Sequence, residues 1–421
     1  MAGNEIPVLL CAPFALLLLV IAVFPLLAPH FWEHNRNKAI IAVALALPVL
    51  IYFGLNRELE AVAETMEEYV SFIVLIGSLF VITGGILFTG DLKATPLVNT
   101  GFLCFGAVMA NFIGTTGASM LLIRPLLKTN SERAFTKHIP VFFIFLVSNI
   151  GGLLTPLGDP PLFLGYLRGV PFGWNLSLWR EWLFAVGVIL AVFYIWDTRA
   201  YNREDLRHRQ RDDIEIQPLQ VAGNINILFL LAVIGLIFFQ VPAPYREIGM
   251  VVASVLSLLL TKRELRQANK FTWGPIAEVA ILFVGIFITM KPLMMLLHAN
   301  GAKLGIVSTW QYFWITGGLS SFLDNAPTYV TTFSLAESVT KVLGAGGHAV
   351  IAGVRNDLLA AISCGAVFMG ANTYIGNGPN FMVKSIAEEQ GFKVPHFFGY
   401  MFYSGCVLIP IFLVMTIIFF R

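Results

Sequence analysis

The chain has 421 residues, of which 57% are hydrophobic and 12% are charged, and its formal net charge at pH 7 is +2. Soluble domains usually carry about 25% charged residues, so this composition excludes an ordinary soluble protein, and the small net charge argues against a nucleic-acid partner. The four cysteines have no spacing that is typical of a metal or redox motif. Composition therefore predicts an integral membrane protein of many spans.

Apolar stretches that are long enough to cross a bilayer occur along the whole chain. A helix needs roughly 20 apolar residues to cross, because no water in the hydrocarbon core satisfies bare backbone groups. On this criterion the sequence predicts an all-α polytopic membrane protein. Its ten predicted spans are 6–28, 39–54, 70–90, 138–167, 182–197, 223–241, 247–261, 273–297, 357–387 and 397–420.

Two further apolar segments, 98–128 and 309–344, are interrupted near the middle by small and polar residues. The interruptions are Phe112–Gly117 and Leu323–Thr328. We predict two re-entrant hairpins, because non-helical backbone at this depth must be buried in protein or line a wet cavity. With both hairpins and an outside N-terminus, the cytoplasmic loops hold more than twice as many Lys and Arg residues as the outside loops, in agreement with the positive-inside rule.

The two halves of the chain contain the same order of hairpin and broken helix. Because the first hairpin enters from the cytoplasm and the second from outside, the predicted repeats are inverted. Inverted repeats are typical of secondary transporters that bind their substrate near the midplane, between the halves. The matching residues are Phe112 with Phe322, Thr155 with Thr373, Gly158 with Gly376 and Pro161 with Pro379.

This repeat divides the chain into scaffold and transport segments. The segments are N-terminal scaffold helices (1–69), repeat 1 (70–197, with hairpin 98–128 and broken helix 138–167), a cytoplasmic linker (198–222), scaffold helices (223–272) and repeat 2 (273–421, with hairpin 309–344 and broken helix 357–387).

Each predicted broken helix is interrupted by a run of Gly, Pro and Asn or Asp residues. The runs are Gly158–Pro161 and Gly376–Asn380; prolines remove amide donors and clash with the preceding turn. A break leaves free carbonyls on one half-helix and free amides on the other. With side-chain oxygens the carbonyls suit a small hard cation such as Na⁺, whereas the amides could hold an anion. The side-chain oxygens come from Thr155, Asp159, Thr373 and Asn377.

Two acids lie where a predicted membrane segment is interrupted: Asp324 in the second hairpin tip and Asp159 in the first break. Each would cost about 2.5–3.5 kcal/mol at the midplane on insertion scales, so each is a functional candidate. A partly desolvated carboxylate binds a proton more readily and can exchange it for a metal ion near neutral pH. A negative carboxylate would instead repel an anionic substrate. The structural alternative for both acids is a helix N-cap.

Lys291 is the other unusual residue, because it lies inside a predicted span. Three interpretations are open. The side chain extends to the interface, it is a charge partner that releases Asp324 when a cation binds, or it holds a carboxylate substrate.

These motifs resemble those of the ion transporter superfamily. Ser148–Gly152 followed by Leu157–Pro161 resembles its SNIGG and IGDPPN signatures, and Ser321–Thr328 resembles its SAxLDNxPT hairpin signature. The superfamily includes NhaD-type sodium/proton antiporters, citrate–metal (CitMHS-like) carriers, arsenite permeases and dicarboxylate carriers. Two positions depart from the pattern: Leu162 replaces a frequent Asn, and the first hairpin lacks the acid that the second has.

The resemblance implies a homodimer in which scaffold helices hold the contact and a mobile transport domain moves as an elevator. Motif matching places Asp324, Asn325, Asp159 and the Thr155/Thr373 pair at the site. Asp324 and Asp159 are the expected Na⁺ ligands. Together with the residues named from the breaks and hairpins, the predicted ion or substrate site consists of Asp324, Asn325, Asp159, Thr115, Thr155, Thr373, Asn377 and Asn380.

The leading prediction is a sodium/proton antiporter that exchanges Na⁺ or Li⁺ for H⁺. The alternatives are a cation-coupled citrate or dicarboxylate transporter, an arsenite-type oxyanion exporter and, from another class, a membrane-embedded enzyme or passive channel. The serine-asparagine-threonine triplets of dicarboxylate carriers are absent from both hairpin tips. We expect no enzymatic activity and no cofactor beyond Na⁺ and H⁺, and a multi-pass protein in the plasma (inner) membrane.

Overall fold

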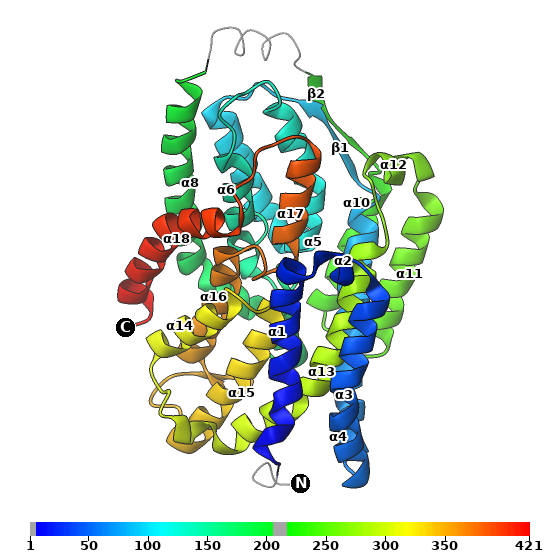
Figure 1. The fold of residues 1–421 in the computed structure, drawn as a ribbon, viewed down its shortest axis with the longest axis vertical. Helices are drawn as coiled ribbons and strands as arrows, with labels where there is room; N and C mark the ends of the chain where they lie inside the picture. Colours follow the sequence, from blue (N-terminus) through cyan, green and yellow to red (C-terminus); the bar gives the residue numbers. More distant parts are fainter. Residues whose placement is uncertain (1–5, 205–216) are drawn as a thin grey trace.

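The computed structural model describes residues 6–204 and 217–421, and most of this part is helical (Figure 1). Among the described residues, seven helical segments are long and apolar enough to cross a membrane. This finding confirms the predicted all-α polytopic class. The seven segments are Val8–Pro25, Asn35–Leu55, Leu59–Thr83, Pro96–Thr129, Phe172–Tyr201, Gly274–Leu304 and Phe397–Phe419.

Helices from the start and the middle of the chain pack together. Phe72 of α4 stacks on Phe283 of α13 with ring centroids 5.0 Å apart. A Cβ atom added at Gly285 of α13 would lie 2.9 Å from the Cβ of Ala42 in α3. Helix α13 therefore lies close to both α3 and α4. These helices are α1 (Ala12–Leu27), α2 (Pro29–Trp32), α3 (Asn35–Leu55), α4 (Leu59–Thr83), α10 (Ile225–Phe238), α11 (Tyr245–Leu260), α12 (Arg263–Ala268) and α13 (Gly274–Asn300), with a 3-10 turn at Val8–Cys11.

The helices α10 and α11 correspond to the predicted spans 223–241 and 247–261, but they have only 14 and 16 residues. A perpendicular crossing needs about 20. The connection between them contains Pro242 and Pro244, which cannot continue a helix because they lack an amide donor. Helix α10 is therefore shorter than its predicted span, whereas α11 has about the predicted length.

In the first half of the chain, α5 (Pro96–Thr129) doubles back on itself. A straight helix of 34 residues would be about 51 Å long, yet the side chains of Asn99 and Asn130 exchange two hydrogen bonds of 2.9 Å. The reversal occurs at Gly114, whose φ of 76° and ψ of 154° are not helical. The chain of α5 therefore reverses its direction near Gly114. It is followed by α6 (His138–Leu146), a 3-10 turn (Ile150–Leu154), α7 (Pro160–Leu167), a 3-10 helix (Phe172–Leu178) and α8 (Trp179–Tyr201).

The second half has a comparable series of elements. Helices α14 and α15 are separated by a short non-helical tip, and they lie in the lower half of Figure 1, whereas α5 lies in the upper half. A break at 370–377 separates α16 from α17. The elements are a 3-10 turn (Gly301–Leu304), α14 (Thr309–Ser320), α15 (Asn325–Leu343), β3 (Val350–Ile351), β4 (Val354–Arg355), α16 (Asn356–Met369), a 3-10 turn (Gly370–Asn372), α17 (Gly378–Glu389) and α18 (Phe397–Phe419).

A two-stranded antiparallel ribbon joins the end of the predicted span 70–90 to the end of the predicted linker 198–222. Strand β1 (Leu87–Asp91) pairs with β2 (Gln217–Ala222), with Leu87 opposite Ala222. The predicted span 70–90 is therefore corrected: α4 ends at Thr83, before Gly84 and Gly85, and the residues after them form a strand. Part of the predicted linker is the partner strand.

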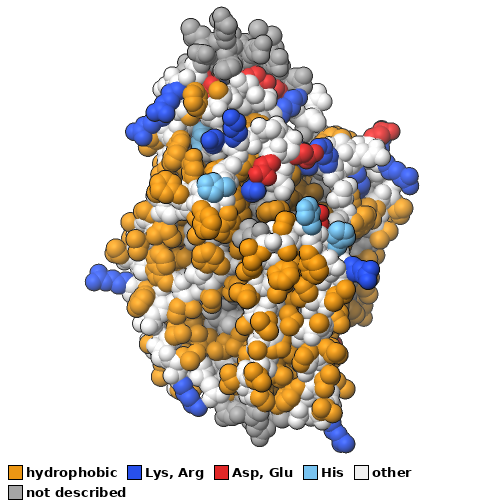
Figure 2. Space-filling view, in the orientation of Figure 1, with side chains coloured by type: hydrophobic (Ala, Val, Ile, Leu, Met, Phe, Trp, Pro, Cys, Tyr) orange, Lys and Arg blue, Asp and Glu red, His pale blue; other side chains and the backbone are white. Residues whose placement is uncertain are grey.

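The surface of the molecule is apolar over most of its length. Figure 2 shows a broad hydrophobic band, with most Lys and Arg side chains of this face in the upper part of the view. The end of α8, the β1–β2 ribbon and α12 lie in that part of the molecule (Figure 1). This distribution is the one expected of a protein that crosses a bilayer and has one strongly basic side.

Candidate functional site

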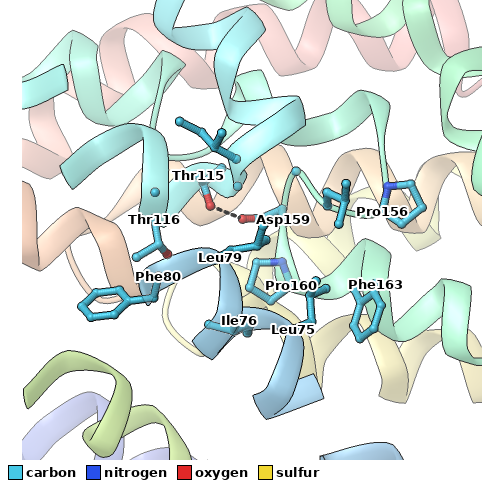
Figure 3. A pocket seen from close by; sticks show the side chains of 15 residues that line it. Leu75, Ile76, Leu79, Phe80, Thr115, Thr116, Pro156, Asp159, Pro160 and Phe163 are labelled. Carbon is cyan, nitrogen blue, oxygen red and sulfur yellow. Dashed lines mark hydrogen bonds between the residues drawn. The ribbon is translucent and has the colours of Figure 1, made fainter. Parts of the chain in front are cut away.

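The Asp159 carboxylate lies at the point where the two halves meet, and it is 1% exposed. The Thr115 hydroxyl, from the first hairpin, donates a 2.7 Å hydrogen bond to Oδ1 (Figure 3). The Asn377 amide, from the second break, donates to the same oxygen at 3.1 Å. The Asn325 amide, from the second hairpin, donates to Oδ2. Both hairpin tips and both breaks therefore converge on one carboxylate.

Three helices begin at this place. Asp159, Asn377 and Asp324 are the N-cap residues of α7, α17 and α15. Prolines near the start of α7 and α17 are favourable there, because the first amides of a helix have no acceptor in the helix. The positive ends of three helix dipoles stabilise a negative group, and the protein itself supplies that group as Asp159.

The charge on Asp159 has no cationic partner among the described residues, where only the neutral donors Thr115, Asn325 and Asn377 contact its oxygens. Buried charges in proteins are usually paired or bind a metal ion. In addition, the buried side-chain carbonyl oxygen of Asn325 accepts no hydrogen bond. An unpaired carboxylate beside an unused carbonyl oxygen is a donor set that suits a small hard cation.

Thr155 and Thr373 fasten the breaks to the hairpins in the same way in each half. The Thr155 hydroxyl donates to the Asn111 carbonyl oxygen at 2.5 Å, and the Thr373 hydroxyl donates to the Ser321 carbonyl oxygen at 2.5 Å. Each hydroxyl also accepts a bond from the amide two residues later. The two threonines that the sequence predicted are thus equivalent, and each uses its hydroxyl to hold a hairpin tip against a break.

Asn149 is a residue of this site that the sequence analysis did not select. Its amide donates to Asn380 Oδ1 at 2.7 Å, and its carbonyl oxygen accepts from Asn377 at 3.2 Å. Asn149 therefore links the first break to the second. Asn380 bonds to Asn149, and Asn149 accepts a bond from Asn377, which also donates to Asp159. It lies inside the Ser148–Gly152 signature, which was the available signal, but the repeat gives no matching Asn at the corresponding position of the second half.

Asp324 and Lys291 have different neighbours in the structure. The Asp324 carboxylate accepts a 3.0 Å bond from the Ala326 amide, so it caps α15, which is the alternative considered above. Lys291 does not pair with Asp324 here: its Nζ lies 3.3 Å from Glu64 Oε2. The physical reason is that α13 packs beside the first turns of α4, whose acid is nearer.

A small cavity adjoins Asp159 and has a volume of about 40 Å³. In Figure 3 the apolar side chains of α4, Leu75 and Leu79 among them, form one wall, and the hairpin tip with Thr115 forms another. A cavity needs about 10–15 Å³ in this measure to hold one water molecule, whereas pockets for organic ligands measure about 300–1,000 Å³. In this conformation the cavity has room for an ion or a water molecule and not for citrate.

Gly114, at the tip of the first hairpin, has a backbone conformation that is almost exclusive to glycine. We expect Gly114→Ala to destabilise the protein by about 1–3 kcal/mol, because any Cβ is strained at φ 76°, ψ 154°. Thermal unfolding of the purified protein measures this. The matched control is Gly101→Ala in the same helix, where a Cβ would meet nothing within 4 Å, so that variant should be no less stable than wild type. Equal unfolding temperatures for Gly114→Ala and wild type would refute the prediction.

The chain is similar to known transporters. The chain is 25% identical over 305 residues to "Uncharacterized transporter slr0753" of Synechocystis sp., an alignment that covers 65% of this chain and 66% of that protein. The chain thus spans slightly less than two thirds of the length of that relative. A family model with the description "Putative citrate transport" matches residues 3–420. The chain therefore belongs to this transporter family, CitMHS_2, and to the ion transporter superfamily that its motifs resemble.

Proposed function

We propose that this transporter exchanges Na⁺ or Li⁺ for H⁺ at an intramembrane site centred on Asp159. The observation that carries the proposal is a buried carboxylate that is held by side chains of both halves, with no cation partner among the described residues. Such a carboxylate is neutralised either by a proton or by a bound cation. Competition between the two for one site is sufficient for exchange.

The chemistry assigns a role to each side chain. Asp159 would bind the proton or the cation, and the Asn325 carbonyl oxygen would supply a further ligand, because it is buried and accepts no bond. Thr115 and Asn377 orient the carboxylate through their hydrogen bonds. Asp324 lies next to Asn325 in the chain, and we propose that its charge adds to the cation preference of the tip. Thr155, Thr373 and Asn380 would hold the breaks in place.

A second candidate is cation-coupled citrate transport, and the description of the family favours it. Helix N-termini such as those around the site bind anions in many proteins. However, the protein's own Asp159 carboxylate already lies there, and a bound citrate would bring further negative charge to the same place. The 40 Å³ cavity is also too small for citrate. Both observations support the small cation over the carboxylate.

Proteoliposomes with an internal pH dye distinguish the two functions. We expect an inward gradient of Na⁺ or Li⁺ to drive alkalinisation of the lumen, and K⁺ or citrate to have no such effect. A silent dye with Na⁺ combined with accumulation of labelled citrate would replace the antiport proposal by the citrate carrier.

Replacing Lys291 provides an independent comparison of the two functions. Because Lys291 Nζ is 3.3 Å from Glu64 Oε2, whose side chain is mostly exposed, and is not in the Asp159 site, we expect Lys291→Ala to leave the rate of cation exchange within about twofold of wild type. If Lys291 held a carboxylate substrate, the KM for citrate would instead rise sharply. Initial rates of dye response and of citrate uptake measure both.

The orientation and assembly of the transporter are also proposals. The basic upper part of the molecule in Figure 2 supports a cytoplasmic location for that side, with the N-terminus outside, under the positive-inside rule. We propose a homodimer in the plasma membrane and an elevator motion of the two hairpins and two broken helices, as the superfamily resemblance implies.

A further inference from the structure

A second and larger cleft, of about 930 Å³, opens at the basic end of the molecule. Its walls are the last turns of α8, the segment 134–138 before and at the start of α6, Lys393 between α17 and α18, and Tyr403 of α18. It shares no residue with the Asp159 cavity. The antiport proposal makes no use of it.

Four cations line this cleft: Lys137, Arg199, Arg203 and Lys393. No Asp or Glu side chain lines it, and none of these four side chains forms an ion pair with a carboxylate among the described residues. Two buried carboxylates near the cleft, Asp197 and Glu204, are paired in the interior. Four like charges around one cleft repel one another unless an anion lies between them.

Unlike these four cations, Arg133 and His138 each contact a carboxylate. Arg133 is paired with Asp197 at 2.7 Å and lies 3.8 Å from Glu204. His138 Nε2 is 2.9 Å from Asp197 Oδ1. Thus Asp197 and Glu204 hold helices together, and the four cations of the cleft have no such partner among the described residues.

The other wall of the cleft is apolar and faces outward at the end of a candidate membrane span. Phe135, Ile195 and Trp196 line the cleft and are 46%, 51% and 38% exposed. Trp196 stacks on Tyr403 with ring centroids 5.4 Å apart. Trp and Tyr side chains are typical of the membrane–water interface. A free anion in water needs no such apolar wall, whereas a phospholipid needs both an apolar wall and cations for its phosphate.

We propose that this cleft binds one anionic phospholipid of the cytoplasmic leaflet. Lys137, Arg199, Arg203 and Lys393 surround its phosphate-bearing head group. Its acyl chains lie along the exposed face of α8 beside Ile195 and Trp196. The site links α8, α6 and the start of α18, so the lipid fastens the basic ends of these helices to one another.

Native mass spectrometry of the purified, delipidated full chain tests this proposal. We expect phosphatidylglycerol to bind at least tenfold more tightly than phosphatidylcholine. The double variant Arg199→Gln/Arg203→Gln should lose at least tenfold in affinity for phosphatidylglycerol, since each Lys or Arg near an anionic surface contributes a several-fold factor. The matched control is Lys262→Gln/Arg263→Gln, two exposed cations outside the cleft, whose affinity should stay within twofold of wild type.

Three outcomes would overturn the lipid site: equal affinity in the Arg199/Arg203 variant and wild type, an equal loss in the control, or displacement of phosphatidylglycerol by inorganic phosphate at the same concentration. The last result would assign the cleft to a soluble anion. If the arginine variant does not fold, Lys137→Gln/Lys393→Gln removes the same charge from the opposite wall. The result is independent of which ion the transporter carries.

Discussion

Asp159→Asn is expected to abolish sodium-driven proton exchange while the protein still folds. The amide has nearly the same shape as the carboxylate, but it neither takes up a proton nor neutralises a bound cation. Removing one partner of a buried charge contact costs about 2–5 kcal/mol, which corresponds to a loss of roughly 30-fold or more. Initial rates of the pH dye in proteoliposomes measure the effect.

The control for this variant is Asp357→Asn, which removes an acid outside the site. Asp357 pairs with Arg355 at 2.5 Å near the start of α16 and contacts none of the site residues described above. Its exchange rate should stay close to that of wild type. Unaltered exchange by a folded Asp159→Asn protein would show that the site is elsewhere.

Asp197→Ala is expected to destabilise the folded protein by about 3–5 kcal/mol, because a buried cation loses its partner. Asp197 is fully buried and receives bonds from Arg133 at 2.7 Å and from Asn99 at 3.0 Å. It also lies 2.9 Å from His138 Nε2. It thereby ties α8 to both ends of the first hairpin and to α6. Thermal unfolding of the purified protein should show a clearly lower Tm.

The exposed pair of Lys270 with Glu389 provides the comparison for Asp197. The neighbouring ammonium lowers the pKa of Glu389, but both side chains are about half exposed. Lys270→Gln should therefore leave Tm almost unchanged, since surface ion pairs add little stability. A Tm for Asp197→Ala equal to that for Lys270→Gln would contradict the assigned role of the buried network.

Much of the fold was predictable because membrane helices depend on local composition. The apolar runs, the hairpin reversal near Gly114 and the break before Pro160 each follow from the residues at that place. The β1–β2 ribbon was not predictable in this way, since it pairs Leu87 with Ala222, and no local pattern indicates so distant a partner. The network of Asp197 was missed for the same reason: its partners are in other helices.

The sequence predicted which residues form the site better than it predicted how they are arranged. The sequence selected Asp159, Thr115, Asn325 and Asn377, and the structure brings these four together. It put Asp324 ahead of Asp159 as the central acid, whereas in the structure the Asp324 carboxylate caps α15 and the Asp159 carboxylate contacts side chains of both halves. Which of two intramembrane acids is at the centre depends on where the hairpin tip turns, and that geometry is set by contacts between the halves.

Proton release on cation binding tests the central proposal most directly. Purified protein in weakly buffered detergent solution is titrated with Na⁺, Li⁺, K⁺ and citrate while a dye records the pH. We expect wild type to release protons with Na⁺ or Li⁺ and not with K⁺ or citrate, and the Asp159→Asn variant to release none. Equal release from wild type and Asp159→Asn, or a pH response to citrate alone, would contradict competition between a cation and a proton at this carboxylate.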